Sequence, residues 1–342
     1  MPQSLPIWLE DNCPDHDDQY DLVGTVLKLA EAGRILSAII AQGENGSAHQ
    51  ASVAVNADGD EQKPLDVIAN DLIVGLLHNS DVAWLASEEL VDAVPVNGRG
   101  RLAVAIDPLD GSSNIDTNLS LGTIFCIYKE DGLGPGSVLQ TGRKQLAAGY
   151  IIYGPQTSLV LTVGQGTSLF VLDRARRQYF LNENNVLIPE ETREFAINAS
   201  NFRHWEEPVK DYVEDCLDGE DGQRGENFNM RWLASLVAEC QRILSRGGVF
   251  LYPADRRQGY EKGRLRLVYE ANAVALLVEQ AGGRATTGET PILDLKPASI
   301  HERVPLVFGS ATEVTRFEDN YVTAGTQRRK APLFAHRGLF AQ

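Results

Sequence analysis

The sequence has few cysteines and histidines and no motif that would combine them into a metal site or a redox pair. Its 342 residues include four cysteines, Cys13, Cys126, Cys216 and Cys240, which are far apart and form no C-x-x-C pair. The six histidines form no H-E-x-x-H motif and no pair four residues apart. We therefore expect reduced thiols, and any metal ion would have to be held by oxygen ligands.

The sequence also lacks a basic surface and a long apolar run. Lys plus Arg number 31 against 47 for Asp plus Glu, a formal charge of −16, which argues against nucleic acid or anionic lipid as a partner. No apolar run reaches the roughly 18 residues of a membrane span, and residues 1–18 show no signal-peptide pattern. We expect a cytoplasmic protein that binds neither nucleic acid nor membranes.

Hydrophobic periodicity predicts a sheet flanked by two early helices. Apolar residues three and four apart predict a helix over Leu22–Ile40 and another from Pro64 to Leu76, with Asp66 in its first turn. Short apolar runs between Gly, Pro and Asn turns predict strands in the following part. These strands are Val82–Ala86, Leu102–Ile106, Thr123–Tyr128, Ala148–Tyr153, Leu159–Val163, Leu169–Leu172 and Tyr179–Leu181.

After Pro189 the pattern becomes an alternation of helices and strands. We expect a helix over Arg231–Leu244, a strand over Val249–Tyr252 and a helix over Leu265–Ala281. The acidic segment Glu10–Asp21 is expected to be a solvated arm, and the polar segment Gly43–Gly59 a loop. At roughly 150 residues per domain, the length fits one large domain or two fused domains.

The string from Asp107 to Asn114, D-P-L-D-G-S-S-N, carries the clearest chemistry. Two carboxylates, Asp107 and Asp110, follow a predicted strand, and Pro108 stiffens the loop between them. They can converge on one point where the Leu109 carbonyl adds a third oxygen, a ligand set that suits Mg²⁺ or Mn²⁺. The N–H groups and hydroxyls that follow could hold a phosphate. The alternative is an Asp/Gly turn with a Ser cap.

Three further carboxylates could extend this site. Glu88 and Glu89 end another predicted strand, where neighbouring side chains point to opposite faces and can serve different positions. Alone, such a pair is usually solvated surface. Glu270 lies in an otherwise apolar helical pattern, where an unpaired carboxylate would be costly, and a metal ion would remove that cost.

Together these motifs resemble class I fructose-1,6-bisphosphatase, and the resemblance runs from about residue 20 to about residue 310. The strings that carry it are Lys63–Val67, Ser87–Glu89, Asp107–Asp116, Ser120–Phe125, Tyr150–Gly154, Gly247–Pro253, Gly263–Glu270 and Glu279–Gly283. Inositol monophosphatases share the Asp-Pro-x-Asp-Gly motif but carry Trp-Asp where Tyr269-Glu270 stands here. The resemblance implies an α/β (α+β) protein with the layered α-β-α-β-α sugar phosphatase fold, assembled as a homotetramer.

The resemblance also implies a division of labour along the chain. Residues 1–193 would form the metal-binding catalytic domain, residues 194–325 the substrate-binding domain, and residues 326–342 a loose tail. Two or more Mg²⁺ ions would bind the following ligands: Glu88, Glu89, Asp107, Asp110, Glu270 and the Leu109 carbonyl. Asp66 with Glu89 would position and deprotonate the attacking water, and Asp60 would swing over the metals from a loop.

For the substrate, the resemblance implies two phosphate sites. The 1-phosphate would lie on Asp110, Gly111, Ser112 and Ser113, with Arg266 near the sugar or the phosphate. The 6-phosphate would be bound by Asn198, Tyr252, Arg264 and, from a neighbouring subunit, Arg231. This implies Mg²⁺-dependent hydrolysis of the 1-phosphate of D-fructose 1,6-bisphosphate, in gluconeogenesis or the Calvin cycle.

The sequence departs from the family pattern in two places. Arg264 replaces a common Lys, Trp232 replaces a common Tyr, and the segment Asn198–Phe202 differs from the common Asn-Glu-Gly. These changes resemble the proteobacterial Calvin-cycle branch and leave open dual or preferential action on sedoheptulose 1,7-bisphosphate. Asp21 and Arg101 stand where AMP-inhibited members carry AMP-binding residues, so we predict weak or absent AMP inhibition.

Two other functions remain open. A catalytically dead regulatory homologue is disfavoured by the complete set of carboxylates, because such proteins usually lose at least one ligand. Inositol monophosphatase activity ranks after it.

Overall fold

The structure is a computed structural model that describes residues 2–13, 19–43, 54–55 and 61–330. The α-helices are α1 Leu5–Asn12, α2 Gln19–Gln42, α3 Pro64–Leu77, α4 Glu207–Asp218, α5 Leu236–Arg246, α6 Asn272–Gln280 and α7 Ala311–Lys330. The strands of the larger sheet are β3 Val82–Ser87, β4 Val94–Pro95, β5 Leu102–Asp110, β6 Leu121–Lys129, β7 Gln145–Tyr153, β8 Thr157–Thr162, β9 Thr167–Asp173 and β10 Gln178–Glu183.

A smaller sheet and two short pairs complete the strands. The smaller sheet has β11 Glu194–Ala196, β12 Asn229–Met230, β13 Val249–Tyr252, β15 Arg284–Thr286 and β17 Leu306–Gly309. The pairs are β1 Ala54–Val55 with β2 Glu61–Gln62, and β14 Leu265–Arg266 with β16 Arg303–Val304.

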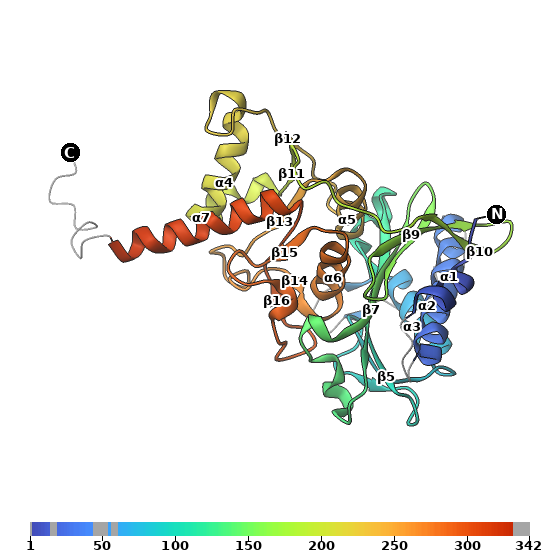
Figure 1. Ribbon diagram of the computed structural model, residues 1–342. Coiled ribbons are helices and arrows are strands. Elements are labelled where there is room, and N and C mark those ends of the chain that lie inside the picture. The colour runs from blue at the N-terminus through green and yellow to red at the C-terminus, as the bar shows by residue number, and fades with distance from the viewer. Residues whose placement is uncertain (1, 14–18, 44–53, 56–60, 331–342) are drawn as a thin grey trace, which may run out of the picture.

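Helices and sheets alternate in five layers (Figure 1). Helices α1, α2 and α3 share a hydrophobic core with one face of the eight-stranded sheet. Helices α5 and α6 lie between the two sheets and pack against both, while α4 and α7 cover the far face of the five-stranded sheet. The expected α-β-α-β-α fold is therefore confirmed.

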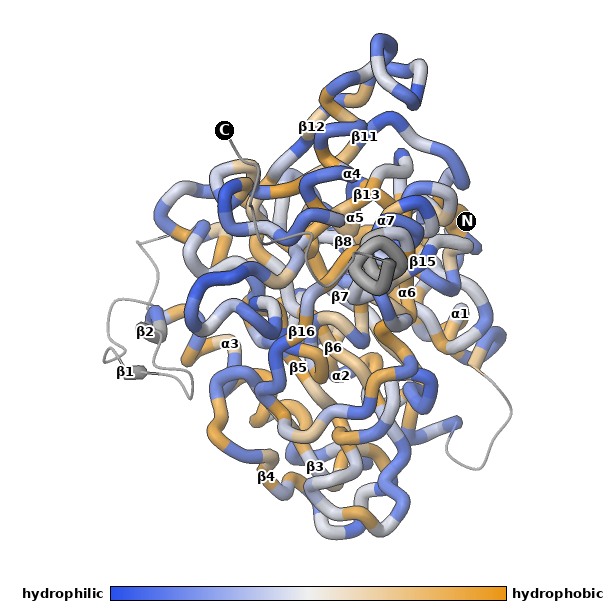
Figure 2. The backbone as a smooth tube through the Cα atoms, turned by 90° about the vertical axis from the view of Figure 1, so that its left-hand side faces the viewer, coloured by the Kyte–Doolittle hydropathy of each residue, from blue (hydrophilic) through white to orange (hydrophobic). Residues whose placement is uncertain are grey.

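The eight-stranded sheet buries β5, one of its inner strands, between helices on both faces. Its order is β10-β9-β8-β7-β6-β5-β3-β4, with β3 and β5 parallel and the other neighbours antiparallel. Every residue of β5 is buried, including the two aspartates at its end. Apolar residues concentrate in the inner strands of the sheet, such as β5, and polar residues lie along the outer loops (Figure 2). A strand covered on both faces reads as a continuous apolar run, as the sequence Leu102–Ile106 does.

The five-stranded sheet brings three parallel strand ends to one edge. Its order is β12-β11-β13-β17-β15, and β11 pairs in parallel with both β12 and β13. Trp232, Asn198 and Tyr252 lie at or just beyond the carboxyl ends of these three strands. Parallel strand ends meet at one sheet edge, which is where open α/β sheets bind ligands.

The predicted strands are confirmed, but two predicted helices begin later than expected. The helix predicted from Arg231 begins at Leu236, because Ala234 has a positive φ of 54° and the Ser235 side chain caps the helix. The helix predicted from Leu265 is preceded by β14, which pairs with β16, and by a π-helical turn, Leu267–Ala271.

The terminal segments also differ from expectation. The prediction of a solvated arm over Glu10–Asp21 was wrong at both ends: α1 runs to Asn12, and Asp21 is buried in α2. Asp21 forms an ion pair with Arg101, whose Nη2 lies 2.5 Å from its Oδ2. Helix α7 continues to Lys330, into the segment expected as a tail. Most of the predicted loop Gly43–Gly59 lies outside the described residues. Among the described helices, none is long and apolar enough to cross a bilayer.

Candidate active site

Asp107 and Asp110 end β5 with their side chains directed toward the same site. On the neighbouring strand β6 their partners are Ile124 and Gly122, so β5 has one more residue than β6 between the two pairs. Residues three apart on a regular strand point to opposite faces. The extra residue is a β-bulge, which shifts the alternation by one and places both carboxylates on one side. The predicted convergence of the two aspartates is confirmed.

Side-chain hydrogen bonds hold the bulge in place. The Thr123 hydroxyl donates to the Pro108 carbonyl at 2.9 Å and lies 2.8 Å from the Tyr153 hydroxyl. The Leu109 N–H donates to Asp107 Oδ1 at 3.0 Å. Leu109, whose carbonyl we predicted as a ligand, is thereby fixed between the two aspartates. All of these groups are buried.

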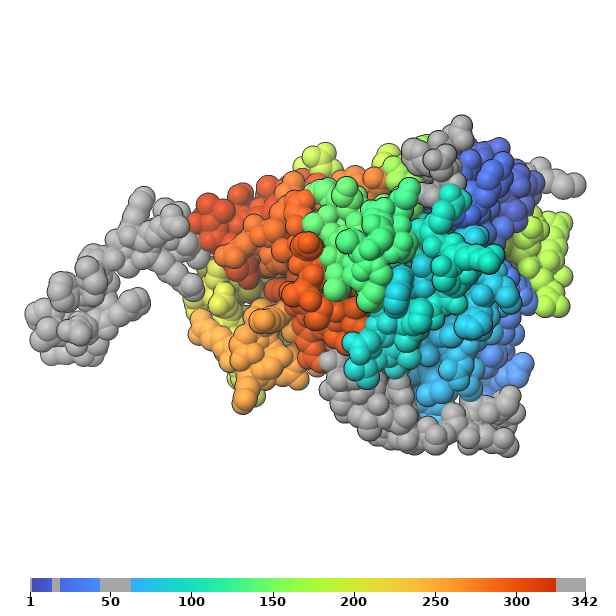
Figure 3. Space-filling model, turned by 90° about the horizontal axis from the view of Figure 1, so that it is seen from below, coloured from blue at the N-terminus to red at the C-terminus, as the bar shows by residue number. Residues whose placement is uncertain are grey.

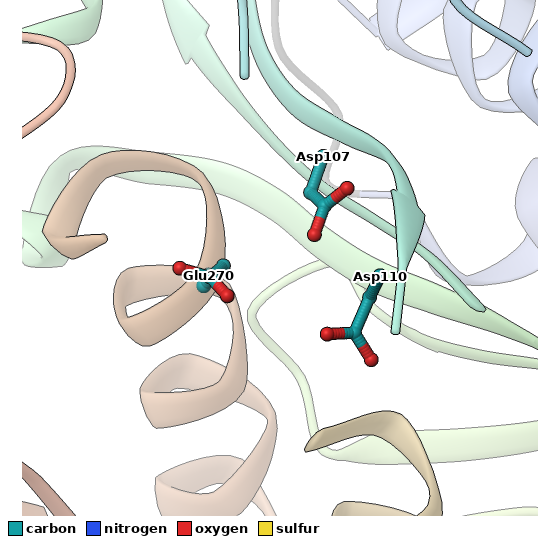
Figure 4. Close-up of side chains that lie close together, drawn as sticks. All are labelled: Asp107, Asp110 and Glu270. Carbon is teal, nitrogen blue, oxygen red and sulfur yellow. The ribbon is translucent and has the colours of Figure 1, made fainter. Parts of the chain in front are cut away.

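Glu270 reaches the same point from the other half of the chain. It lies in the π-helical turn Leu267–Ala271, and its carboxylate accepts a hydrogen bond from the Arg266 N–H. Oxygens of Asp107, Asp110 and Glu270 all lie within 4.8 Å of one another. Figure 4 shows Glu270 on its helical turn, across from the two aspartates of β5. Three buried carboxylates at this spacing can ligate a divalent cation.

Glu88 and Glu89 lie in the turn that follows β3, next to β5. The Glu88 N–H donates to the Ile106 carbonyl at 3.1 Å, and the Ser87 hydroxyl donates to Asn70 Oδ1 at 2.8 Å. Glu88 Oε1 is 3.9 Å from a guanidinium nitrogen of Arg266. Arg266 therefore lies beside the carboxylates. Asn70, four residues after Asp66 on the same face of α3, supports this turn through Ser87, although no motif in the sequence marks it.

Asp66 lies in the first turn of α3 with one oxygen satisfied and one without a partner. Its Oδ2 accepts the Lys63 N–H at 2.8 Å. Its Oδ1 is buried and has no hydrogen-bond partner within the described part of the chain. Burial, reinforced by the nearby charges of Glu89 and Glu88, raises the pKa of Asp66 to about 7. A carboxylate tuned in this way can accept a proton near neutral pH.

The pKa values of the other carboxylates of the site are raised as well. Burial raises the pKa of Glu88 to about 7 and that of Asp110 to about 6. Burial and mutual repulsion also raise the pKa values of Asp107 and Glu270 well above their ordinary range. Arg266 is the cation that counters this charge at Glu88 and Glu270. The residues fit a bound divalent cation, whose charge would remove the repulsion.

The segment after Asp110 packs against the N-terminus of α5. Gly111 has a φ of +79°, which a glycine adopts without strain, and it opens the 3₁₀ turn Ser112–Thr117, which contains Ser113. The Asn114 side chain donates to the Ala234 carbonyl at 3.0 Å, and the Val237 N–H donates to Asp110 Oδ2 at 3.2 Å. The predicted 1-phosphate residues therefore adjoin the carboxylate cluster.

Two of the predicted 6-phosphate residues lie together. The Arg264 guanidinium is 5.7 Å from the Tyr252 ring and 4.5 Å from the Tyr260 ring. Tyr252 also contacts Trp232 edge to face, with ring centroids 5.9 Å apart. Asn198 follows β11, the strand beside β13, and accepts a hydrogen bond from the Ser200 N–H.

Two predicted residues are not brought to this group within the described chain. The Arg231 guanidinium is 3.5 Å from Glu194 Oε1, at the start of β11 rather than at the end that leads to Asn198. Asp60 lies outside the described residues.

Comparison with known proteins identifies the family. The family model "Fructose-1-6-bisphosphatase, N-terminal domain" matches residues 9–184, and "Fructose-1-6-bisphosphatase, C-terminal domain" matches residues 188–322. A fructose-1,6-bisphosphatase class 1 of Sinorhizobium medicae is 50% identical over 339 residues, 96% of both chains. One of Paracoccus denitrificans is 53% identical over 312 residues, 91% of this chain and 93% of its own.

A solved structure agrees with these relatives. The holo form of Leishmania major fructose-1,6-bisphosphatase superposes with a TM-score of 0.87 at 30% identity, covering 94% of this chain and 99% of that one. The layered fold with its buried carboxylate cluster thus defines a phosphatase of the metal-dependent sugar phosphatase class. Within that class, the chain belongs to the class 1 fructose-1,6-bisphosphatase family.

Proposed function

We propose that the chain hydrolyses the 1-phosphate of D-fructose 1,6-bisphosphate and releases D-fructose 6-phosphate and phosphate. The observation that carries the proposal is the buried triad of Asp107, Asp110 and Glu270, whose oxygens lie within 4.8 Å of one another. Each of the three carboxylates is costly in an otherwise apolar core without a cation. Their presence there therefore indicates a functional requirement.

Two or more Mg²⁺ ions, with Mn²⁺ as a substitute, are the cofactors we propose. The ligands would be Glu88, Glu89, Asp107, Asp110, Glu270 and the Leu109 carbonyl. Bound at these oxygens, the ions would supply positive charge for the phosphate and for the attacking and leaving oxygens. Five carboxylates without cations would instead repel a bisphosphate.

The residues of the chain would bind the substrate and move one proton. Asp66, with its pKa near 7 and an unpartnered oxygen, would accept the proton of the attacking water together with Glu89. Asp60 would close over the site from its loop. The N–H groups and hydroxyls of Gly111, Ser112 and Ser113 would hold the 1-phosphate beside Asp110, with Arg266 nearby.

The 6-phosphate would be bound at the edge of the five-stranded sheet. Tyr252 and Arg264 lie together there, and Asn198 follows the adjacent strand. Arg231 would act from a neighbouring subunit of a homotetramer. We propose the same two functional parts as the sequence indicated, a metal-binding part over residues 1–193 and a substrate-binding part over residues 194–325, in a cytoplasmic enzyme of gluconeogenesis or the Calvin cycle.

Sedoheptulose 1,7-bisphosphate is the second candidate substrate. The observation that favours it is the contact of Trp232 with Tyr252, beside Arg264, because an indole and a guanidinium here alter the shape of the distal phosphate site. The ratio of kcat/KM on the two sugars decides between them. A dead homologue is disfavoured because every predicted carboxylate of the described chain is present near the cluster.

Phosphate release from fructose 1,6-bisphosphate tests the proposal. We expect Mg²⁺-dependent release by the wild type and a loss of at least about 100-fold in Asp110→Asn, which removes one ligand charge. Asp131→Asn, the same substitution at an exposed loop position, is the control and should match the wild type. No release by the wild type, or equal release by Asp110→Asn, would contradict the proposed function.

A further inference from the structure

His301 bridges the two turns that carry the carboxylates of opposite halves of the site. Its Nδ1 is 2.9 Å from the hydroxyl of Tyr269, the residue before Glu270. Its Nε2 is 2.9 Å from the carbonyl oxygen of Leu90, the residue after Glu89. One side chain therefore makes hydrogen bonds to both turns, although within the described residues it forms no hydrogen bond or ion pair with a carboxylate.

The chemistry of the groups fixes the direction of the bond to Leu90 and, for a neutral imidazole, also the direction of the bond to Tyr269. The Leu90 carbonyl can only accept, so Nε2 of His301 must carry the hydrogen. A neutral imidazole then offers Nδ1 as an acceptor, and the Tyr269 hydroxyl donates to it. The chain of bonds runs from Tyr269 through His301 to Leu90, and each donor meets one acceptor. Asn or Lys at this position could not provide the same pair of bonds with the same spacing.

The surrounding backbone holds His301 firmly beside the Glu270 turn. Strand β16, which begins two residues later, pairs with β14, and the Leu267 N–H donates to the Glu302 carbonyl at 2.7 Å. The Tyr269 ring is fully buried and meets the imidazole edge to face, with centroids 5.9 Å apart. In the space-filling view, the orange surface of the C-terminal half abuts the teal and green surface of the N-terminal half (Figure 3).

We propose that His301 is a positioning residue for the metal site, which sets the separation of the Glu88–Glu89 turn from the Glu270 turn. The inference rests on the proposed function, since it assumes that these carboxylates bind the metal together. Glu88 follows β3, whereas Glu270 stands in a helical turn that packs on β5 and β6 of the same sheet. The separation of the two carboxylates therefore depends on how the two turns are held together. His301 joins them at the residue after Glu89 and at the residue before Glu270.

The inference predicts a selective defect. Loss of the bridge lets the two turns move apart, so metal affinity falls because the ligands are no longer held at the distance the cation requires. Within the described chain, His301 makes no hydrogen bond to Tyr252 or Arg264, which line the sugar-binding edge. KM for the sugar bisphosphate at saturating Mg²⁺ should therefore stay within about twofold, since the sugar contacts are retained.

Graded variants test each bond separately. His301→Gln keeps a donor for Leu90 and loses the acceptor for Tyr269, Tyr269→Phe removes the same bond from the other side, and His301→Ala removes both. The control is His78→Ala, a histidine exposed at the end of α3. Mn²⁺ binding to the metal-free protein is measured by calorimetry, and Mg²⁺ activation and KM are measured by phosphate release.

We expect the dissociation constant for Mn²⁺ to rise roughly 10-fold in His301→Ala and roughly threefold in each single-bond variant, with His78→Ala unchanged. Wild-type Mn²⁺ affinity in His301→Ala, or an equal rise in Mn²⁺ dissociation constant and in KM, would overturn the inference. If His301→Ala does not fold, His301→Gln and Tyr269→Phe decide by the same criteria. A wild type that binds Mn²⁺ but releases no phosphate would contradict the proposed function alone, because the binding comparison does not use activity.

Discussion

Replacing Asp66 with Asn should make the metal-free protein more stable at alkaline pH and the loaded enzyme less active. Asp66 is 3% exposed, and its Oδ1 accepts no hydrogen bond within the described residues. Asn keeps an oxygen that can accept the Lys63 N–H, a bond of 2.8 Å in the wild type, so the first turn of α3 is retained. The substitution removes the charge and little else.

The magnitude follows from the pKa of Asp66, which burial raises from 3.8 to about 7. A folded-state pKa above the unfolded one means that the stability contributed by this group is fully present below pH 3.8 and is lost as the pH rises through 7. At about 1.36 kcal/mol per tenfold change in acidity, wild-type unfolding free energy should fall by about 2.5 kcal/mol between about pH 5 and pH 8 because of Asp66 alone. Asp66→Asn should lack that loss.

The assay is thermal unfolding in EDTA at both pH values. A difference of about 2.5 kcal/mol corresponds to roughly 3–4 °C in Tm for a chain of this size. The Tm of Asp66→Asn should therefore fall less between the two pH values than the Tm of the wild type. Other carboxylates of the site titrate in both proteins, so the difference between the two pH effects isolates Asp66. In excess Mg²⁺, phosphate release should drop by roughly 100-fold or more, as for loss of a general base.

An equal fall of Tm in both proteins between the two pH values would refute the reasoning, because Asp66 would then not ionise at a cost. Asp131→Asn, at an exposed position, serves as the control and should show the wild-type dependence on pH. If Asp66→Asn loses activity but keeps the wild-type dependence of Tm on pH, Asp66 is needed for the reaction, but the raised pKa assigned to it is contradicted.

Two more predictions concern packing and regulation. Gly122→Ala should lower Tm and weaken Mn²⁺ binding, because a Cβ would lie 2.5 Å from Val237 and push α5 away from Asp110; overpacking of this kind costs about 1–3 kcal/mol. AMP at millimolar concentration should leave phosphate release unchanged, because Asp21 is buried in an ion pair with Arg101 and its negative charge repels a phosphate.

The controls for these two predictions are simple. Gly75→Ala, in α3 with nothing within 4 Å of the added Cβ, should be neutral or stabilising. An unchanged Tm and an unchanged Mn²⁺ affinity in Gly122→Ala would contradict the expectation that the added Cβ pushes α5 away from Asp110. Inhibition of phosphate release by micromolar AMP would contradict the second prediction.

The site could be predicted where its chemistry is local. The string around Asp107 and Asp110 carries its own turn residues, so the convergence of the two carboxylates could be predicted from the sequence alone. The reason for the convergence is the extra residue of β5 relative to β6, and it is visible only once Asp110 is paired with Gly122. Glu270 was recognised because a carboxylate in an apolar run needs a partner.

Features that depend on distant residues could not be predicted from the sequence. Leu265 fits the apolar period of the helix that follows, but it pairs with Val304 as a strand. Trp232 and Leu233 fit the period of α5, but the positive φ of Ala234 separates them from it.

For two side chains, no pattern in the sequence indicates the partner that they contact in the structure. Asp21 looked solvated because its partner Arg101 lies 80 residues away. His301 stands alone in a loop, and no spacing links it to Tyr269 or Leu90 before the chain is folded.

The two portions of the chain that the family models match each supply part of the carboxylate cluster. Asp107 and Asp110 come from the portion matched by the N-terminal family model, and Glu270 comes from the portion matched by the C-terminal one. A gene split in the connecting stretch, residues 185–187, would yield two polypeptides with an incomplete set of ligands each. Catalysis would then require the fragments to meet, so the rate would depend on the product of their concentrations, and added metal would favour the reunited pair.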